Sequence, residues 1–148
     1  MKTLKHLLIE LNACKEGVKW AEDKTIEEVV EQCHRGDWLL WLAQKVDIDL
    51  KPLMLAKGHC ANTVRHLIKD ERSIKAVDAA IEYGEGKATQ EDLFSDAYVG
   101  YSAYAAASAY AAASGYAAAR KENEILTADI CRNYIGDLII NKVNELIK

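Results

Sequence analysis

The stretch AYAAASAYAAASGYAAAR, residues 103–120, repeats a unit of six residues built from alanine, serine and tyrosine. It belongs to a longer segment, residues 97–119, that carries no charged side chain. A rotation of about 100° per residue places Tyr104, Tyr110 and Tyr116 on three different sides of one helix. A helix without a polar side is typical of a protein interior. We therefore expect a long central helix that the other segments surround.

A membrane span is one alternative for this segment, because its uncharged length approaches that of a bilayer crossing. Its apolar content is almost entirely alanine and tyrosine, without leucine, isoleucine or phenylalanine, so we expect no membrane insertion. A coiled-coil seam needs a repeat of 3.5 residues, which a six-residue unit does not supply. The remaining alternative is a groove for a partner or ligand lined by tyrosines, namely Tyr98, Tyr101, Tyr104, Tyr110 and Tyr116.

Helical periodicity extends over the rest of the 148 residues. Apolar residues recur at three and four positions from Leu4 to Ala21, which predicts one amphipathic helix. Thr25 and Glu28 have the spacing of a capping box, and we expect Gly36 to end the short helix that they begin. A further helix is predicted to begin at Asp37 as its N-cap, and the next has Pro52 in its first turn and Gly58 inside it. Another is predicted to begin at Asp70 and to end at Gly84 or Gly86. Thr89 and Asp92 are predicted to start the long alanine-rich helix, and a last helix is predicted from about Leu126 onward. The sequence thus predicts an all-α fold, a single-domain helical bundle over residues 1–148 with about six or seven helices around the Ala/Tyr-rich central helix.

The composition argues against several classes of protein. One proline and eight glycines are few for a protein of strands and turns. The net charge of −4 is mildly acidic, and we expect no nucleic-acid partner because phosphates require clustered lysine and arginine. The N-terminal residues do not have the pattern of a secretion signal, so we expect the cytoplasm.

The sequence offers little for catalysis or metal binding. Its cysteines lie far apart without a CxxC pair, and we expect reduced, buried thiols at Cys14, Cys33, Cys60 and Cys131. The neighbours Cys33–His34 and His59–Cys60 point about 100° apart on a helix, so one metal ion would rarely use both members of a pair. We expect no metal, no cofactor and no enzyme activity.

Three groups of residues are candidates for contact with a partner. The first is an acidic helix surface that suits a basic protein, and the second is a tryptophan pair three residues apart, a residue type enriched in binding hot spots. The third is an arginine in the first turn of a helix, where the helix dipole disfavours a cation unless it pairs with a carboxylate elsewhere. Each group also has a purely structural interpretation. The acidic surface would be a solvated helix face, the tryptophans would be core residues, and the arginine would form a salt bridge between helices that involves Asp78. The candidates are Glu27, Glu28, Glu31, Asp37, Trp38, Trp41 and Arg72.

The segments CANTVRHL and DERSIKAVDAAIEYGEGK resemble immunity proteins of bacterial toxin systems, of the immunity-family-five-like kind. Ser73 stands where that family has proline. The matching positions are Cys60, Ala61, Val64, Asp70, Arg72, Ala76, Ala79, Ala80, Tyr83 and Gly86. The segment CHRGDWLLWLAQK also resembles small proteins of phage and prophage genomes.

The resemblance implies a non-catalytic protein-binding module, an immunity-like inhibitor of a protein toxin. The alternative is a phage-encoded accessory or anti-defence protein that binds a host factor or sequesters a small ligand.

Overall fold

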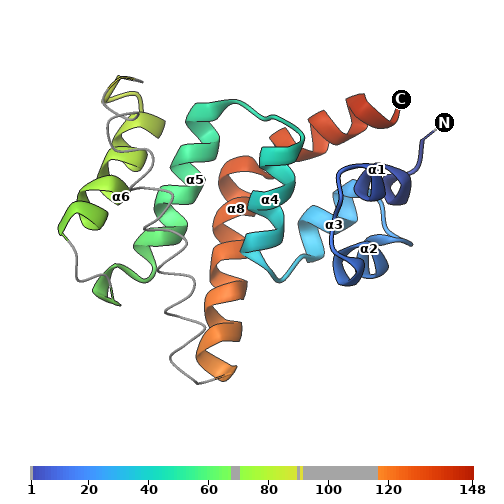
Figure 1. Ribbon diagram of the computed structural model, residues 1–148, viewed down its shortest axis with the longest axis horizontal. Helices are drawn as coiled ribbons and strands as arrows, with labels where there is room; N and C mark the ends of the chain where they lie inside the picture. The colour runs from blue at the N-terminus through green and yellow to red at the C-terminus, as the bar shows by residue number, and fades with distance from the viewer. Residues whose placement is uncertain (1, 68–70, 90, 92–116) are drawn as a thin grey trace.

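The computed structural model describes residues 2–67, 71–89, 91 and 117–148. Every regular element in these residues is helical, which confirms the predicted all-α class. The seven α-helices of the described residues are α1 (Leu4–Glu10), α2 (Lys15–Ala21), α3 (Ile26–Gln32), α4 (Gly36–Lys45), α5 (Leu50–Asn62), α6 (Glu71–Gly84) and α8 (Ala117–Ile147), with one 3₁₀ turn, η1 (Arg65–Leu67). Figure 1 shows α6 and α5 at one side of the molecule, α4 and α8 in the middle, and α1–α3 at the other side.

The long C-terminal helix α8 is the element on which most of the described helices pack. It contacts α1, α3, α4 and α5, and its side chains Ile135, Ile139 and Val143 are fully buried. Residues 97–116 of the predicted central helix, which spans residues 97–119, lie outside the described residues, so their place in the fold stays a prediction. Among the described residues the central position belongs to α8.

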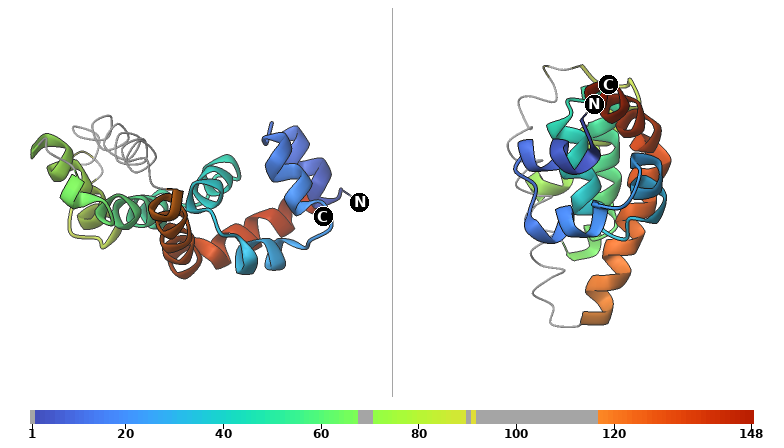
Figure 2. Two further views of the ribbon diagram at one scale, coloured as in Figure 1. Left: turned by 90° about the horizontal axis from the view of Figure 1, so that it is seen from below. Right: turned by 90° about the vertical axis from the view of Figure 1, so that its right-hand side faces the viewer.

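Helix α8 begins at Ala117, nine residues before the predicted start at Leu126. The intervening residues 117–125 are mostly alanine and long charged side chains, which favour helix, and none of them is glycine or proline. The predicted start at about Leu126 was therefore wrong, and residues 117–119 of the predicted Ala/Tyr-rich helix are part of α8. Figures 1 and 2 show that α8 changes direction along its length, so that its C-terminal part runs toward α1–α3.

The predicted first helix is divided into α1 and α2. Asn12 has a φ of 63°, in the left-handed region. The amide of Ala13 donates to the Leu8 carbonyl at 2.9 Å and that of Asn12 to the Ile9 carbonyl at 3.0 Å. These two bonds form a Schellman motif, in which asparagine replaces the usual glycine. Apolar spacing continues across the turn, which is why periodicity alone predicted one helix.

The same motif ends two further helices. Asp47, with a φ of 61°, follows α4, and Gly86, with a φ of 81°, follows α6. The closing bonds run from the Ile48 amide to the Ala43 carbonyl at 3.2 Å and from the Lys87 amide to the Glu82 carbonyl at 2.8 Å. The predicted stop at Gly84 or Gly86 is thus met at Gly86, since Gly84 is the last residue of α6.

The helix starts were predicted with mixed success. Thr25 and Glu28 form the capping box of α3, and Pro52 lies in the first turn of α5. The assignment of Asp37 as the N-cap of α4 is wrong, because Arg35 takes that position without a side-chain cap. Gly36 is the first residue of α4 rather than the end of α3: a Cβ there would lie 2.6 Å from the backbone carbonyl carbon of Thr127 on α8.

Helices α5 and α6 approach each other through glycine. A Cβ on Gly58 of α5 would lie 2.6 Å from Cγ1 of Ile81, and one on Gly84 of α6 would lie 2.8 Å from the Cα of Leu55. Each glycine therefore leaves room for the opposite helix. Gly58 does not interrupt α5, and its presence inside the helix is explained by this contact.

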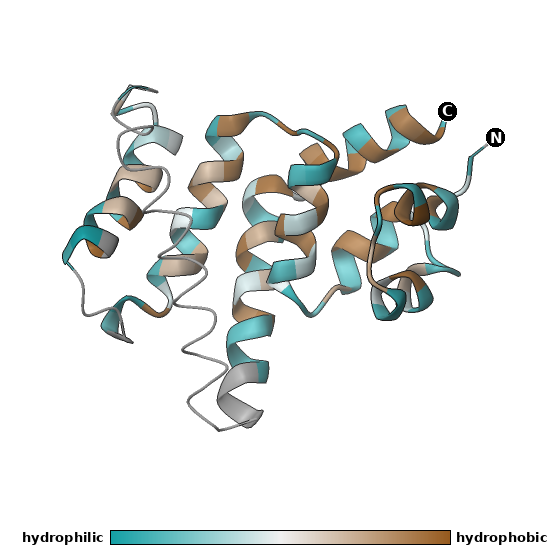
Figure 3. Ribbon diagram, viewed as in Figure 1, coloured by the Kyte–Doolittle hydropathy of each residue, from teal (hydrophilic) through white to brown (hydrophobic). Residues whose placement is uncertain are grey.

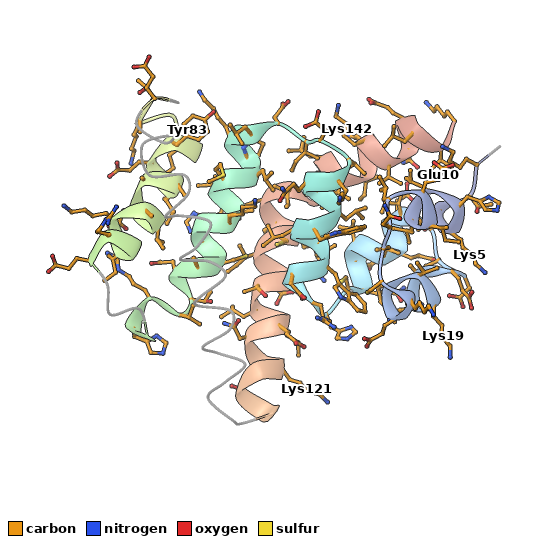
Figure 4. All side chains as sticks on the ribbon, viewed as in Figure 1. Lys5, Glu10, Lys19, Tyr83, Lys121 and Lys142 are labelled. Atoms are coloured by element: carbon orange, nitrogen blue, oxygen red, sulfur yellow. The ribbon has the colours of Figure 1, made fainter. Side chains whose placement is uncertain are left out.

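Large apolar side chains of α4, α5 and α8 are buried, for example Leu39, Leu53 and Ile135. Figure 3 shows hydrophobic residues, in brown, alternating with hydrophilic residues, in teal, along these helices. Lysines such as Lys5 and Lys19 extend outward from α1 and α2 (Figure 4). Both ends of the chain lie at the α1–α3 end of the molecule (Figures 1 and 2).

Candidate functional site

A pocket of about 400 Å³ lies between the α1–α2 unit and α4. Its walls contain Trp20, Trp38 and Trp41, which are all three tryptophans of the chain. The other lining residues are largely apolar: Leu8, Asn12, Ala13, Cys14, Gly17, Ala21, Val29, Cys33, Asp37, Leu39 and Leu42. Asn12, Cys14 and Asp37 are exposed, so they mark the mouth of the pocket.

Local sequence explains how the walls are placed. Trp38 and Trp41 lie three residues apart on α4 and therefore share a helix face. The left-handed turn at Asn12 sends the chain from α1 into α2, which carries Trp20. Cys14 is the N-cap of α2 and accepts a hydrogen bond from the Gly17 amide at 3.4 Å. The pocket thus depends on the turn between α1 and α2 and on the position of α2 opposite α4.

Two of the tryptophans belong to an aromatic cluster. The ring centroids of Trp20 and Trp38 are 6.0 Å apart, and His34 lies 6.0 Å from Trp20 and 6.1 Å from Trp38. Such tilted and edge-on contacts are the favoured geometries of aromatic pairs. Two cations lie over the rings: the Lys24 ammonium at 4.7 Å from Trp20 and the Arg35 guanidinium at 4.5 Å from Trp38.

The charged groups at the pocket mouth are paired. Asp37 accepts two hydrogen bonds from Arg35, at 2.7 Å to Nη2 and 3.2 Å to Nε. The hydrogen bond to Asp37 raises the pKa of Arg35. The guanidinium is thus held between the Trp38 ring and a carboxylate, an arrangement that fixes the ring by stacking and ion pairing together.

The structure brings together three of the predicted partner-binding residues, Asp37, Trp38 and Trp41, in this pocket. Sequence reasoning missed Trp20, which completes the aromatic wall, and Arg35, which neutralises Asp37. The signal for Trp20 was weak because it lies alone in an amphipathic helix. Its meeting with Trp38 depends on how α2 packs against α4.

The acidic residues Glu27, Glu28 and Glu31 lie on α3, outside the pocket lining. Glu28 serves the capping box, accepting a bond from the Thr25 amide at 3.0 Å. Glu27 accepts a hydrogen bond from the Asn144 side chain at 3.0 Å, and this bond lowers the pKa of Glu27. Glu31 is exposed. The three carboxylates therefore form a surface of their own next to the C-terminal part of α8.

Arg72 is exposed on α6, in another part of the molecule from the tryptophan pocket. Asp78, the carboxylate considered beside it in the sequence, accepts two bonds from Arg65 of η1, at 2.5 and 3.1 Å. The hydrogen bond to Asp78 raises the pKa of Arg65. Asp70 lies outside the described residues, as do the five tyrosines of the predicted groove, Tyr98, Tyr101, Tyr104, Tyr110 and Tyr116.

The four cysteines are free, and three of them are buried. Cys14 is exposed, so the expectation of a buried thiol there was wrong; its sulfur caps α2 at the surface. Cys60 on α5 and Cys131 on α8 approach to 3.8 Å between sulfurs. This contact and burial raise the pKa of the Cys60 thiol, and burial raises that of Cys33. No group of three or more metal-ligating side chains occurs among the residues that the structure describes.

No family model, curated protein or solved structure matches the chain. Within the described ranges, no helix combines the length and apolar character that a membrane crossing requires. The described positions that carry the resemblance to immunity proteins lie on or just after α5 and α6, and those buried there are Cys60, Ala61, Val64, Ala76, Ala80 and Tyr83. They belong to the interior of this part of the molecule.

Proposed function

We propose that the protein is a non-catalytic protein-binding module that inhibits its partner by occupying part of the partner's surface. The observation that carries this proposal is the convergence of all three tryptophans on one pocket. Tryptophan is among the residues that contribute most to interface energy, because a large apolar ring loses much water-exposed area on contact. An apolar side chain of the partner would enter the space between Trp20 on α2 and the tryptophans of α4.

The acidic surface of α3 gives this proposal a second element. Glu27, Glu28 and Glu31 lie together on one short helix that precedes α4. Surface charges of one sign accelerate the encounter with a partner of the opposite sign more than they strengthen the final complex. We therefore propose a basic partner that is steered by α3 and anchored by the pocket.

The resemblance to immunity proteins suggests a protein toxin as the partner. A toxin and its immunity protein are expected to be encoded side by side, so the product of the neighbouring gene is the protein to test. Isothermal titration calorimetry of the two purified proteins should show a complex of one-to-one stoichiometry. Trp38→Ala and Trp41→Ala should each weaken it by about 30-fold or more, the effect of losing a hot-spot residue.

Tyr134→Ala is the matched control, because Tyr134 is an exposed aromatic residue of α8 that does not line the pocket. It should leave the affinity unchanged. Replacing Glu27, Glu28 and Glu31 together by glutamine should slow association and reduce its salt dependence. A complex with unchanged affinity in both tryptophan variants would refute the proposed anchor, and absence of any complex would refute the toxin as partner.

A second candidate function is the capture of a small ligand, as in a phage-encoded accessory or anti-defence protein. The volume of about 400 Å³ favours it, since small-molecule sites commonly have volumes of about 300–1,000 Å³ and mostly apolar walls. A ligand that binds the folded state raises the melting temperature by mass action. A rise that occurs in the wild type and disappears in Trp38→Ala would support capture in this pocket.

A further inference from the structure

The free hydrogen-bonding groups of the tryptophan pocket are mainly donors. None of the three indole N–H groups has a hydrogen-bond partner among the described residues, and none is both buried and unsatisfied, so each nitrogen remains accessible. Among the side-chain acceptors of the lining, those of Asp37 and Cys14 are already used, and the Asn12 amide adds one acceptor beside two donors. Asp37 accepts two bonds from Arg35, and the Cys14 sulfur accepts one from the Gly17 amide. A ligand that fits this inventory must bring acceptors.

The charges around the rings point the same way. Lys24 and Arg35 lie over Trp20 and Trp38 but do not line the pocket, and each is ion-paired, Lys24 with Asp23 and Arg35 with Asp37. A cation inside the cavity would meet no unpaired carboxylate, because the one carboxylate of the lining, that of Asp37, is bound to Arg35. Aromatic surroundings alone would suit a cation, but this charge arrangement does not.

We infer that the pocket binds a planar aromatic small molecule, uncharged or anionic, whose polar atoms are carbonyl or carboxylate acceptors. The inference rests on the second proposed function, capture of a small ligand, and it adds the chemical class of that ligand. The aromatic plane packs against the tryptophan rings, and the acceptor atoms bind indole N–H groups. A volume of about 400 Å³ is large enough for such a ligand, since small-molecule sites commonly have volumes of about 300–1,000 Å³.

The test uses the full chain labelled with ¹⁵N, because its three indole N–H groups all belong to the pocket and give three separate NMR signals. Trp20→Phe, Trp38→Phe and Trp41→Phe assign them while keeping an aromatic ring at each position. Four matched probes are titrated: 2-naphthoate, 2-naphthamide, 2-naphthylmethylammonium and the saturated decahydro-2-naphthoate. They differ in the functional group at one position or in the saturation of the two rings.

We expect 2-naphthoate and 2-naphthamide to shift the indole signals with saturable curves. The ammonium probe should bind about tenfold more weakly, because it leaves the donors without acceptors. The saturated acid should also bind several-fold more weakly, since it lacks the flat ring that stacks on tryptophan. Trp41→Phe should weaken the binding of 2-naphthoate by about three- to tenfold, because one hydrogen-bond donor is lost. Tyr134→Phe, outside the pocket, should leave the affinity for 2-naphthoate unchanged.

Three results would overturn the inference. Equal or tighter binding of the ammonium probe would show a cation site instead. Equal binding of the saturated acid would show a pocket without aromatic selectivity. Absence of any indole shift with all four probes would exclude a small aromatic ligand altogether. The protein-partner proposal is tested separately by the Trp38→Ala and Trp41→Ala complexes, so it stands or falls independently of these titrations.

Discussion

The side of the molecule built on α8 and the pair formed by α5 and α6 are packed in different ways. On α8, large aliphatic side chains such as Ile135 and Ile139 are completely buried against α1, α3, α4 and α5. Between α5 and α6 the closest approaches are at Gly58 and Gly84. The small core cluster described there, Ala61 and Val77 with Ile81, is separate from the large one.

The difference shows that two kinds of packing carry different signals in a sequence. Burial of large side chains produces an apolar stripe with helical period, which can be recognised in the order of the amino acids alone. Close contact through glycine produces only a residue that looks like a helix breaker. Mutations should therefore act on the two sides by opposite mechanisms, namely cavities on the α8 side and overpacking between α5 and α6.

The largest effect is expected from Ile139→Ala on α8. Ile139 has no exposed surface, and truncation leaves a cavity in the large core cluster. The free energy of unfolding should fall by about 3–4 kcal/mol, measured by urea denaturation followed by circular dichroism. Ile140→Ala is the control. Because Ile140 is only partly buried, this variant should lose clearly less free energy of unfolding. Equal losses in the two variants would contradict the central role of α8.

Gly84→Ala tests the opposite mechanism between α5 and α6. The added methyl group would lie 2.8 Å from the Leu55 Cα and 3.0 Å from its backbone nitrogen, so the helices must separate. We expect a net loss of about 2 kcal/mol even though alanine favours helix over glycine by about 1 kcal/mol. Hydrogen exchange should accelerate mainly in α6. Gly17→Ala is the control, because the added methyl group would have the Cys14 sulfur, at 3.3 Å, as its nearest atom. A similar loss of stability in this variant would contradict overpacking between α5 and α6 as the cause.

Arg132→Ala should have an intermediate effect on the α8 side. The Arg132 guanidinium donates to the Val30 carbonyl at 2.8 Å and the Cys33 carbonyl at 2.6 Å, at the C-terminal end of α3. Removing it should cost about 1.5 kcal/mol. Arg132→Lys should recover little, because one ammonium group does not reproduce the planar fork. Arg65→Ala, at the exposed ion pair with Asp78 beside α6, should change the urea midpoint less.

The smallest effect concerns the contact between Glu27 and Asn144. Its hydrogen bond lowers the pKa of Glu27 below the ordinary value of 4.5, so the folded state favours the ionised carboxylate. The resulting stabilisation is fully present above pH 4.5 and is lost as the pH falls through the folded-state pKa. Asn144→Ala should cost a few tenths of a kcal/mol at pH 7, since the site is exposed. The difference from wild type should vanish in acid, and a difference independent of pH would contradict the assignment.

Much of the fold could be predicted from the sequence because it depends on local rules. The capping box at Thr25 and Glu28 was correct because both partners lie within one turn. The split at Asn12 was missed because the apolar spacing continues through it, although asparagine is the side chain besides glycine that most often adopts the left-handed conformation. Asp37 was misassigned as a cap because its carboxylate binds the guanidinium of Arg35 instead of the first-turn amides.

The candidate site was only half predictable. Trp38 and Trp41 stand out by their spacing on one helix, and Asp37 lies beside them. Trp20 gives no such signal, because its contact with Trp38 spans two helices and the intervening α3. The acidic residues of α3 were grouped correctly with one another, but only the structure separates them from the pocket.

Interactions within a few residues were enough to predict that the chain is helical, that α3 begins at a capping box, that α6 ends at Gly86, and which faces are apolar. Packing between distant segments was needed to show that α8 packs against α1, α3, α4 and α5, that Gly58 and Gly84 are contact points, and that three tryptophans share one pocket. These features depend on which helix faces meet, and many pairings of apolar faces satisfy the same periodicity. The fit of specific shapes, including a missing Cβ or a neighbouring ring, selects among them.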